Sequence, residues 1–126
     1  MNCFKNSLLF FAFFSVSFSA FSQGAGSPKM QDIFLTFLQK KMALTPQESS
    51  QMRPLVARYL FETRKIHRDF DDPLVREQQK IALKIKYRNL FTPIIGNDRS
   101  NRFFIEEQIF KRRVREELRQ RKNFKS

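Results

Sequence analysis

The sequence predicts an all-α protein of four helices, arranged as an elongated antiparallel helical hairpin or bundle. Apolar residues recur every three to four positions in four consecutive segments, which is the periodicity of helices that bury one face. The 126 residues include only 3 glycines, too few for the turns of a β-sandwich or barrel. The connections expected at 43–45, 70–72 and 96–97 are short, so neighbouring helices should be antiparallel.

The first 22 residues have the pattern of a cleaved export signal. Lys5 supplies a short basic region, and an apolar stretch runs from Leu8 to Phe21. Ala20 and Ser22 are the small residues that precede a cut before Gln23. An uncleaved membrane anchor is the less favoured alternative, because the apolar stretch is interrupted by serines and falls short of the ~20 apolar residues that a span needs.

This signal defines the expected organisation and location of the chain. Residues 1–22 would be removed, 23–28 would form a flexible linker, 29–122 a single helical domain and 123–126 a basic tail. We expect the protein to be periplasmic, with no stable membrane span after cleavage. The only cysteine, Cys3, lies in the signal, so the exported protein would fold without disulfides.

The first two helices have clear sequence signals. In the segment from Pro28 to about Met42, apolar residues follow helical spacing. The second helix starts at Leu44-Thr45-Pro46-Gln47-Glu48, where Thr45 and Glu48 form a capping box and Pro46 occupies the first helical position. Pro54 interrupts the apolar pattern of the second helix and predicts a kink.

The third helix is expected from Asp72, its N-cap, to about Ile95, with Gly96 at its C-terminus and Pro93 loosening or ending its last turn. It carries two apolar stripes on opposite sides, with a basic stripe between them. A chain this small cannot easily bury both sides of one helix, so we expect one apolar stripe to pack inside the monomer and the other on a partner. The fourth helix should extend from about Asp98 to Lys122.

We assign partner binding to the third helix. Electrostatic capture is assigned to the basic stripe: Arg76, Lys80, Lys84 and Arg88. Apolar contact with the partner is assigned to one apolar stripe: Leu83, Tyr87, Leu90 and Ile94. The alternative is a helix buried on both sides within a single domain.

Several kinds of chemistry are not expected. With one His and one Cys, the chain cannot build a zinc site from these residues alone. A metal site at His67 with Asp69 or Asp71 is less favoured than solvated surface residues. Adjacent glutamates such as Glu106 and Glu107 point about 100° apart on a helix, so caps and solvated faces explain them better than a catalytic pair. We therefore expect no enzyme activity, no cofactor and no bound metal.

The net charge of +12, with a pI near 10.5, is the strongest physical signal. Such a positive field attracts anionic partners. Export argues against nucleic acid, which leaves acidic protein surfaces and anionic envelope components. The alternative is a solvated basic surface that only keeps the protein soluble.

The start of the second helix resembles the LTxxQ motif of the Spy/CpxP-like periplasmic family, with Glu48 in place of the final Gln. The following Met52-Arg53-Pro54-Leu55 is similar to the FWPxY stretch of short Bacteroidota members, some of which are labelled sensors of an ECF-type sigma factor. The closing-helix residues Ile94-Ile95-Gly96 and Phe103-Phe104 extend the resemblance, which covers roughly residues 30–122.

The resemblance implies a thin, curved, all-helical fold, often a homodimer, that binds unfolded clients as an ATP-independent chaperone or acts as an envelope-stress accessory. The main alternative that it implies is a regulatory sensor acting on an anti-sigma or sensor-kinase partner. Metal-sensing members use several histidines, whereas this chain has one, so a metal-responsive sensor is the least favoured alternative.

Overall fold

The computed structural model describes residues 28–125, and within that range it is all-α, as predicted. The helices are α1 (Pro28–Lys41), α2 (Pro46–Asp69), α3 (Pro73–Ile95) and α4 (Asn97–Lys125). The expected signal and residues 23–27 of the expected linker lie outside the described residues. The helix α4 ends three residues later than the predicted Lys122, so most of the expected basic tail is helical.

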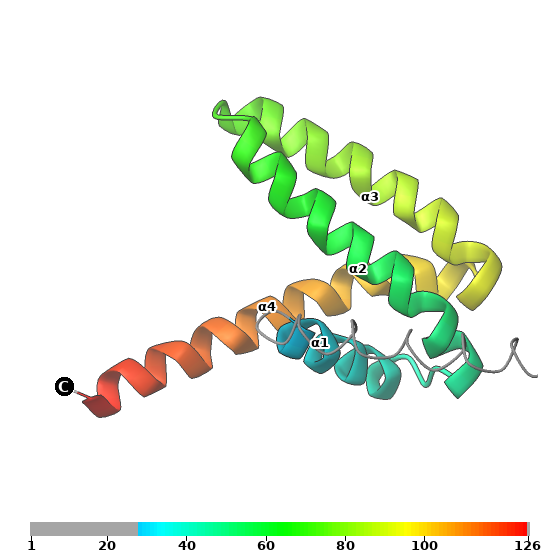
Figure 1. Cartoon of the computed structure of the whole chain (residues 1–126), viewed down its shortest axis with the longest axis horizontal. Coiled ribbons are helices and arrows are strands. Elements are labelled where there is room, and N and C mark those ends of the chain that lie inside the picture. The colour runs from blue at the N-terminus through cyan, green and yellow to red at the C-terminus, as the bar shows by residue number, and fades with distance from the viewer. Residues whose placement is uncertain (1–27, 126) are drawn as a thin grey trace, which may run out of the picture.

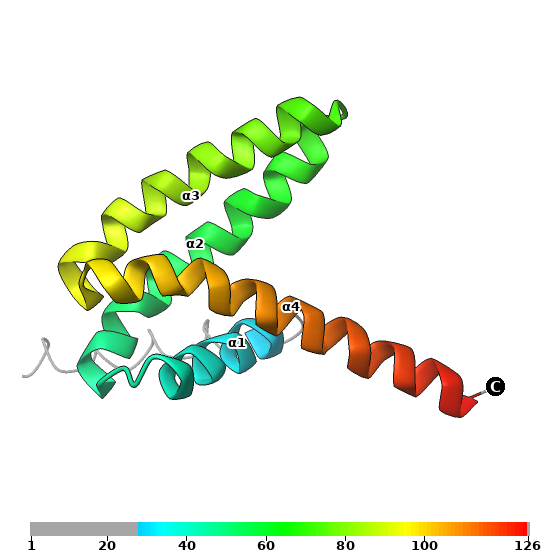
Figure 2. The ribbon, with the colours of Figure 1, turned by 180° about the vertical axis from the view of Figure 1, so that it is seen from behind.

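The four helices form two antiparallel pairs that diverge from a common vertex. In Figure 1, α2 and α3 make one arm of a V and α1 lies along the first half of α4 in the other arm. The view from behind in Figure 2 shows the same divergence and shows the end of α4 extending beyond α1. The predicted antiparallel hairpin is present as α2–α3, whereas the second pair joins the first and last helices of the chain, and the two pairs do not form one parallel-sided bundle.

The interior of α2 contains Pro54, as the sequence indicated, and the helix continues through it. A proline removes one backbone hydrogen bond and crowds the preceding turn, which bends a helix. Figure 1 shows α2 changing direction in its N-terminal part, where Pro54 lies. This bend helps to carry the rest of α2 away from α1 and α4. Pro93 likewise does not end α3, which continues to Ile95.

Aromatic rings from all four helices meet in the core. Phe103 of α4 is fully buried, and its ring centroid lies 4.6 Å from that of Phe91 and 5.6 Å from that of Tyr59. Phe34 of α1 also packs against Phe103, with 5.8 Å between the ring centroids. Tyr87 of α3 lies 5.4 Å from Tyr59. This aromatic cluster joins the two arms near the vertex of the V.

The end of α1 has a tight turn that the sequence did not indicate. Ala43 has a φ of 50°, in the left-handed region. The N–H of Leu44 donates to the carbonyl of Gln39 at 3.1 Å, which is the hydrogen bond of a Schellman turn. Glycine normally occupies the left-handed position of this turn because it has no Cβ to clash. The expected glycine at the end of α3, Gly96, does have a positive φ, of 85°.

Replacing Ala43 with glycine should stabilise the protein. The left-handed conformation costs a non-glycine residue about 1–2 kcal/mol, and the greater freedom of glycine in the unfolded chain offsets about half of that gain. We expect the free energy of unfolding to rise by about 0.5–1 kcal/mol in urea denaturation. Ala82→Gly, in the exposed middle of α3, is the control and should lower it by a similar amount. Destabilisation by Ala43→Gly would show that the turn is not strained.

Candidate functional site

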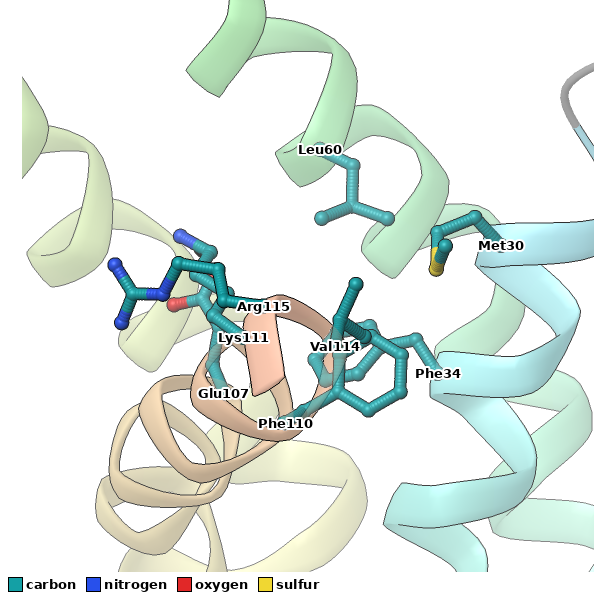
Figure 3. A pocket seen from close by; sticks show the side chains of 8 residues that line it. All are labelled: Met30, Phe34, Leu60, Glu107, Phe110, Lys111, Val114 and Arg115. Atoms are coloured by element: carbon teal, nitrogen blue, oxygen red, sulfur yellow. Dashed lines mark ion pairs between the residues drawn. The ribbon is translucent and has the colours of Figure 1, made fainter. Parts of the chain in front are cut away.

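An apolar cleft of about 350 Å³ opens between the two arms of the V. Its walls come from the start of α1, the middle of α2 and the middle of α4, and Figure 3 shows the side chains converging on it. Such a volume lies within the range of about 300–1,000 Å³ that ligand pockets typically have. The apolar lining residues are Met30, Phe34, Leu60, Phe110 and Val114.

Packing against the core orders the floor of the cleft. Phe34 is buried, and its ring centroid lies 5.0 Å from that of Phe110 on α4. Phe110 also packs at 5.3 Å against Phe37. Met30, in contrast, is 51% exposed although it lines the cleft. The floor is therefore closely packed on the α4 side, and apolar surface remains uncovered at its α1 edge.

One side of the cleft is charged. Lys111 and Arg115 of α4 line it, and Figure 3 shows both side chains on the side away from α1. Glu107, one turn before Lys111, is only 1% exposed and accepts a hydrogen bond of 2.7 Å from the Tyr59 hydroxyl. The Lys111 ammonium lies 3.3 Å from the second oxygen of Glu107, Oε2, which receives no well-directed hydrogen bond from the described residues.

This burial corrects the prediction that caps and solvated faces explain the paired glutamates. Glu107 is buried, and its neighbour Glu106 is 8% exposed and lies 3.8 Å from Arg102. Burial, together with the Glu107 charge, raises the pKa of Tyr59 well above its usual 10.0. The sequence did contain an indication that Glu107 is buried. Glu107 occupies a position of the apolar stripe of the fourth helix, between Phe103 and Phe110.

The predicted basic stripe is present on α3. Arg76 is half-buried and donates from Nε to the carbonyl of Phe70 at 3.0 Å. Lys80 and Lys84 are half-buried and Arg88 is exposed, and these three form no ion pair with any residue between 28 and 125. Arg76 therefore has a structural role, whereas the other three cations have no acidic partner among those residues.

His67 of α2 lies in the electrostatic field of cations from two other helices. The charge of Lys80, then partial loss of hydration, then the charges of Arg76 and Lys111 lower the pKa of His67 below its usual 6.5. Lys80 belongs to α3 and Lys111 to α4, so the basic stripe and the charged edge of the cleft act on the same exposed residue of α2. The cations of the two arms thus contribute to one positive field.

The apolar stripe that we assigned to a partner is wrong for three of its four residues. Tyr87 is 1% exposed in the core, and Leu83 and Ile94 are half-buried against that core. Only Leu90, 41% exposed, faces outward. The stripe packs inward because Tyr87 meets Tyr59 on α2. The other stripe of the helix is the uncovered one, and its exposed members are Leu74, Ile81 and Ile85.

The capping box is confirmed. The N–H of Glu48 donates to the Thr45 hydroxyl at 3.1 Å, and the N–H of Thr45 donates to Glu48 Oε1 at 3.0 Å. Pro46 is the first residue of the helix, and Leu44 before the cap is buried. Sequence reasoning missed that Arg99 of α4 also donates to both oxygens of Glu48. This motif is thus a structural tie between α2 and α4.

The Glu48–Arg99 pair should make stability depend on acid pH. Hydrogen bonds from Arg99 and then from the Thr45 backbone hold the pKa of Glu48 below its usual 4.5. The pair therefore contributes fully above about pH 4.5, and its contribution is lost as the pH falls below that value because the folded state must take up a proton.

Chemical denaturation at neutral pH and at about pH 3 should measure this dependence. We expect Glu48→Gln to lower the midpoint at neutral pH and to reduce the fall between the two pH values. Glu77→Gln, at an exposed position on α3, should change neither quantity. An equal acid dependence in the Glu48→Gln variant would exclude this pair as its source.

Among residues 28–125, no three His, Cys, Asp or Glu side chains lie close enough together to hold a metal ion. No helix in that range is long and apolar enough to cross a membrane. No protein-family model, curated protein or solved structure is significantly similar to this chain.

Proposed function

We propose that the protein is an exported, helical protein-binding protein that holds partly unfolded clients without ATP. The observation that carries the proposal is the apolar cleft between the arms, which has cations along one side and uncovered apolar surface at the other. Residual apolar surface beside a positive field suits unfolded segments that expose apolar side chains together with acidic ones. The charge pattern and the resemblance to the Spy/CpxP-like family support the same reading.

Two parts of the molecule would act in sequence. The cations Lys80, Lys84 and Arg88 would accelerate encounter with an acidic segment, since charge steering raises association rates more than affinity. Apolar side chains of the client would then replace water in the cleft, where Met30, Leu60 and Val114 remain partly accessible. Release would need only dissociation, because the apolar area involved is small.

Aggregation of a chemically denatured acidic client, followed by light scattering with and without the purified protein, tests this proposal. We expect suppression that weakens between about 0.01 and about 0.15 M salt, because the Debye length shrinks from about 30 to about 8 Å. Lys80→Glu with Lys84→Glu should reduce suppression at low salt. Lys40→Glu with Lys65→Glu gives the same net charge at exposed positions outside the basic stripe and should reduce suppression less.

A second pair of variants distinguishes client binding in the cleft from non-specific binding to other exposed apolar surface. Met30→Ser with Val114→Ser should weaken suppression at every salt concentration, because both residues line the cleft. Ile81→Ser with Ile85→Ser removes apolar surface from the outer stripe of α3 and should leave suppression intact. Equal losses in both pairs would exclude the cleft as the binding site.

The absence of suppression at several-fold excess would instead favour the alternative, a regulatory sensor that binds an anti-sigma or sensor-kinase domain. Affinity purification from envelope extracts would then be the decisive experiment. Recovery of no membrane regulator would count against that alternative.

A further inference from the structure

The last three turns of α4 form a projecting helical arm. Every residue of this arm, defined as residues 115–125, is exposed. Figures 1 and 2 both show the arm continuing past the start of α1, away from the other helices. At 1.5 Å per residue, it extends about 16 Å from the body of the protein. Packing within the described residues therefore gives no reason for the length of α4.

Four of the five cations of the arm gather on one side. Arg115, Arg119, Lys122 and Lys125 follow one another at intervals of four, three and three residues, which places them in one row along the helix, and Arg121 lies beside this row. Leu118 lies within this row, three residues after Arg115 and four before Lys122, and is 53% exposed. The two acidic residues of the arm, at 116 and 117, fall outside the row. The arm thus presents a basic face with an aliphatic side chain in its centre.

We propose that this basic face binds the surface of anionic lipid bilayers and holds the protein at the membrane without spanning it. Helices that lie on a membrane combine cations, which attract anionic headgroups, with apolar side chains that enter the headgroup boundary. Nucleic acid is the weaker match, since the row contains no aromatic ring on which a base could stack. This surface shares only Arg115 with the cleft that is proposed to bind clients, and the variants below leave Arg115 unchanged.

Co-sedimentation of the full protein with lipid vesicles tests the proposal. We expect binding to phosphatidylcholine vesicles that contain about 30% phosphatidylglycerol to exceed binding to pure phosphatidylcholine vesicles and to disappear at high salt. Arg119→Glu, Lys122→Glu and Lys125→Glu together should lower the partition coefficient at least about a hundredfold, at roughly fivefold for each cation lost. The matched control is Lys40→Glu, Lys65→Glu and Arg68→Glu, which has the same net charge and should retain most binding.

A local reporter shows which part of the chain reaches the lipid. The protein has no tryptophan, so Leu118→Trp introduces a single indole into the basic face. Its emission should shift to the blue on anionic vesicles and stay unchanged on zwitterionic ones. Phe61→Trp, at a position of α2 that is 54% exposed, is the control and should not shift.

Three results would overturn the proposal. The first is no preference for anionic vesicles. The second is an equal loss of binding in the arm and control charge variants, which would mean that only net charge matters. The third is an unshifted emission of the Leu118→Trp variant on vesicles that sediment the protein.

Discussion

Phe103→Ala is expected to lower the free energy of unfolding by about 3–5 kcal/mol, the cost of removing a buried phenyl ring from a close-packed core. Phe103 has no exposed surface, and its ring contacts Phe34, Tyr59 and Phe91, one from each of the other helices. A cavity there would separate the two arms of the V. Because a small domain is stable by only about 5–15 kcal/mol, a large part of the variant should be unfolded at moderate urea concentrations.

Urea denaturation followed by circular dichroism measures this effect, and the same change at Phe124 is the matched control. Phe124 is 92% exposed near the end of the arm, so Phe124→Ala should leave the midpoint almost unchanged. A loss of under about 1 kcal/mol in Phe103→Ala would mean that the aromatic cluster does not hold the two arms together.

Tyr59→Phe should cost about 1–3 kcal/mol, although it removes a single oxygen atom. The Tyr59 hydroxyl is the hydrogen-bond donor, at 2.7 Å, to a Glu107 carboxylate that is 1% exposed. Without this donor, the carboxylate stays buried with only the Lys111 ammonium nearby. A buried charge that loses a partner is destabilising, whereas replacing the whole polar group by an apolar one is often tolerated.

A double-mutant cycle that combines Tyr59→Phe with Glu107→Leu tests this coupling. We expect the double variant to be more stable than the sum of the two single changes predicts, because the two introduced apolar side chains would meet without leaving an unpaired polar atom. Additive losses would show that the two side chains are not coupled.

Alkaline pH gives a second readout of the same pair. Burial raises the pKa of Tyr87 to about 12 and that of Tyr59 further, so the unfolded chain releases these protons first. Stability should therefore be complete below about pH 10 and fall as the pH rises above it, and Tyr59→Phe should reduce that fall.

Local signals in the sequence were sufficient for the helices. The capping box at Thr45, the Asp72 cap followed by Pro73, and the positive φ of Gly96 are all present, because each depends on a few neighbouring residues. The left-handed turn at Ala43 was not predicted, since alanine gives no sign of it. The length of α4 was underestimated because its last residues lack an apolar pattern.

Features that depend on contacts between helices could not be predicted to the same degree. The two apolar stripes of the third helix were identified, but periodicity does not tell which stripe meets Tyr59, and the wrong one was assigned to the partner. The cleft requires residues from three helices and the divergence of the two arms, neither of which is encoded in any single segment. The Glu48–Arg99 pair joins residues 51 positions apart, so no local pattern in the sequence indicates it.

The guanidinium of Arg99 has a consequence for how the two arms are held. It bonds Glu48 at the start of α2 and the carbonyls of Met42 and Ile95, at the ends of α1 and α3. All these groups lie at the vertex, and Figure 1 shows the turn between α2 and α3 at the opposite end of that arm. The α2–α3 pair is thus held at the vertex and, through the Tyr59–Glu107 hydrogen bond, at the middle of α2. These contacts set the angle between the two arms, and with it the width of the cleft that lies between them.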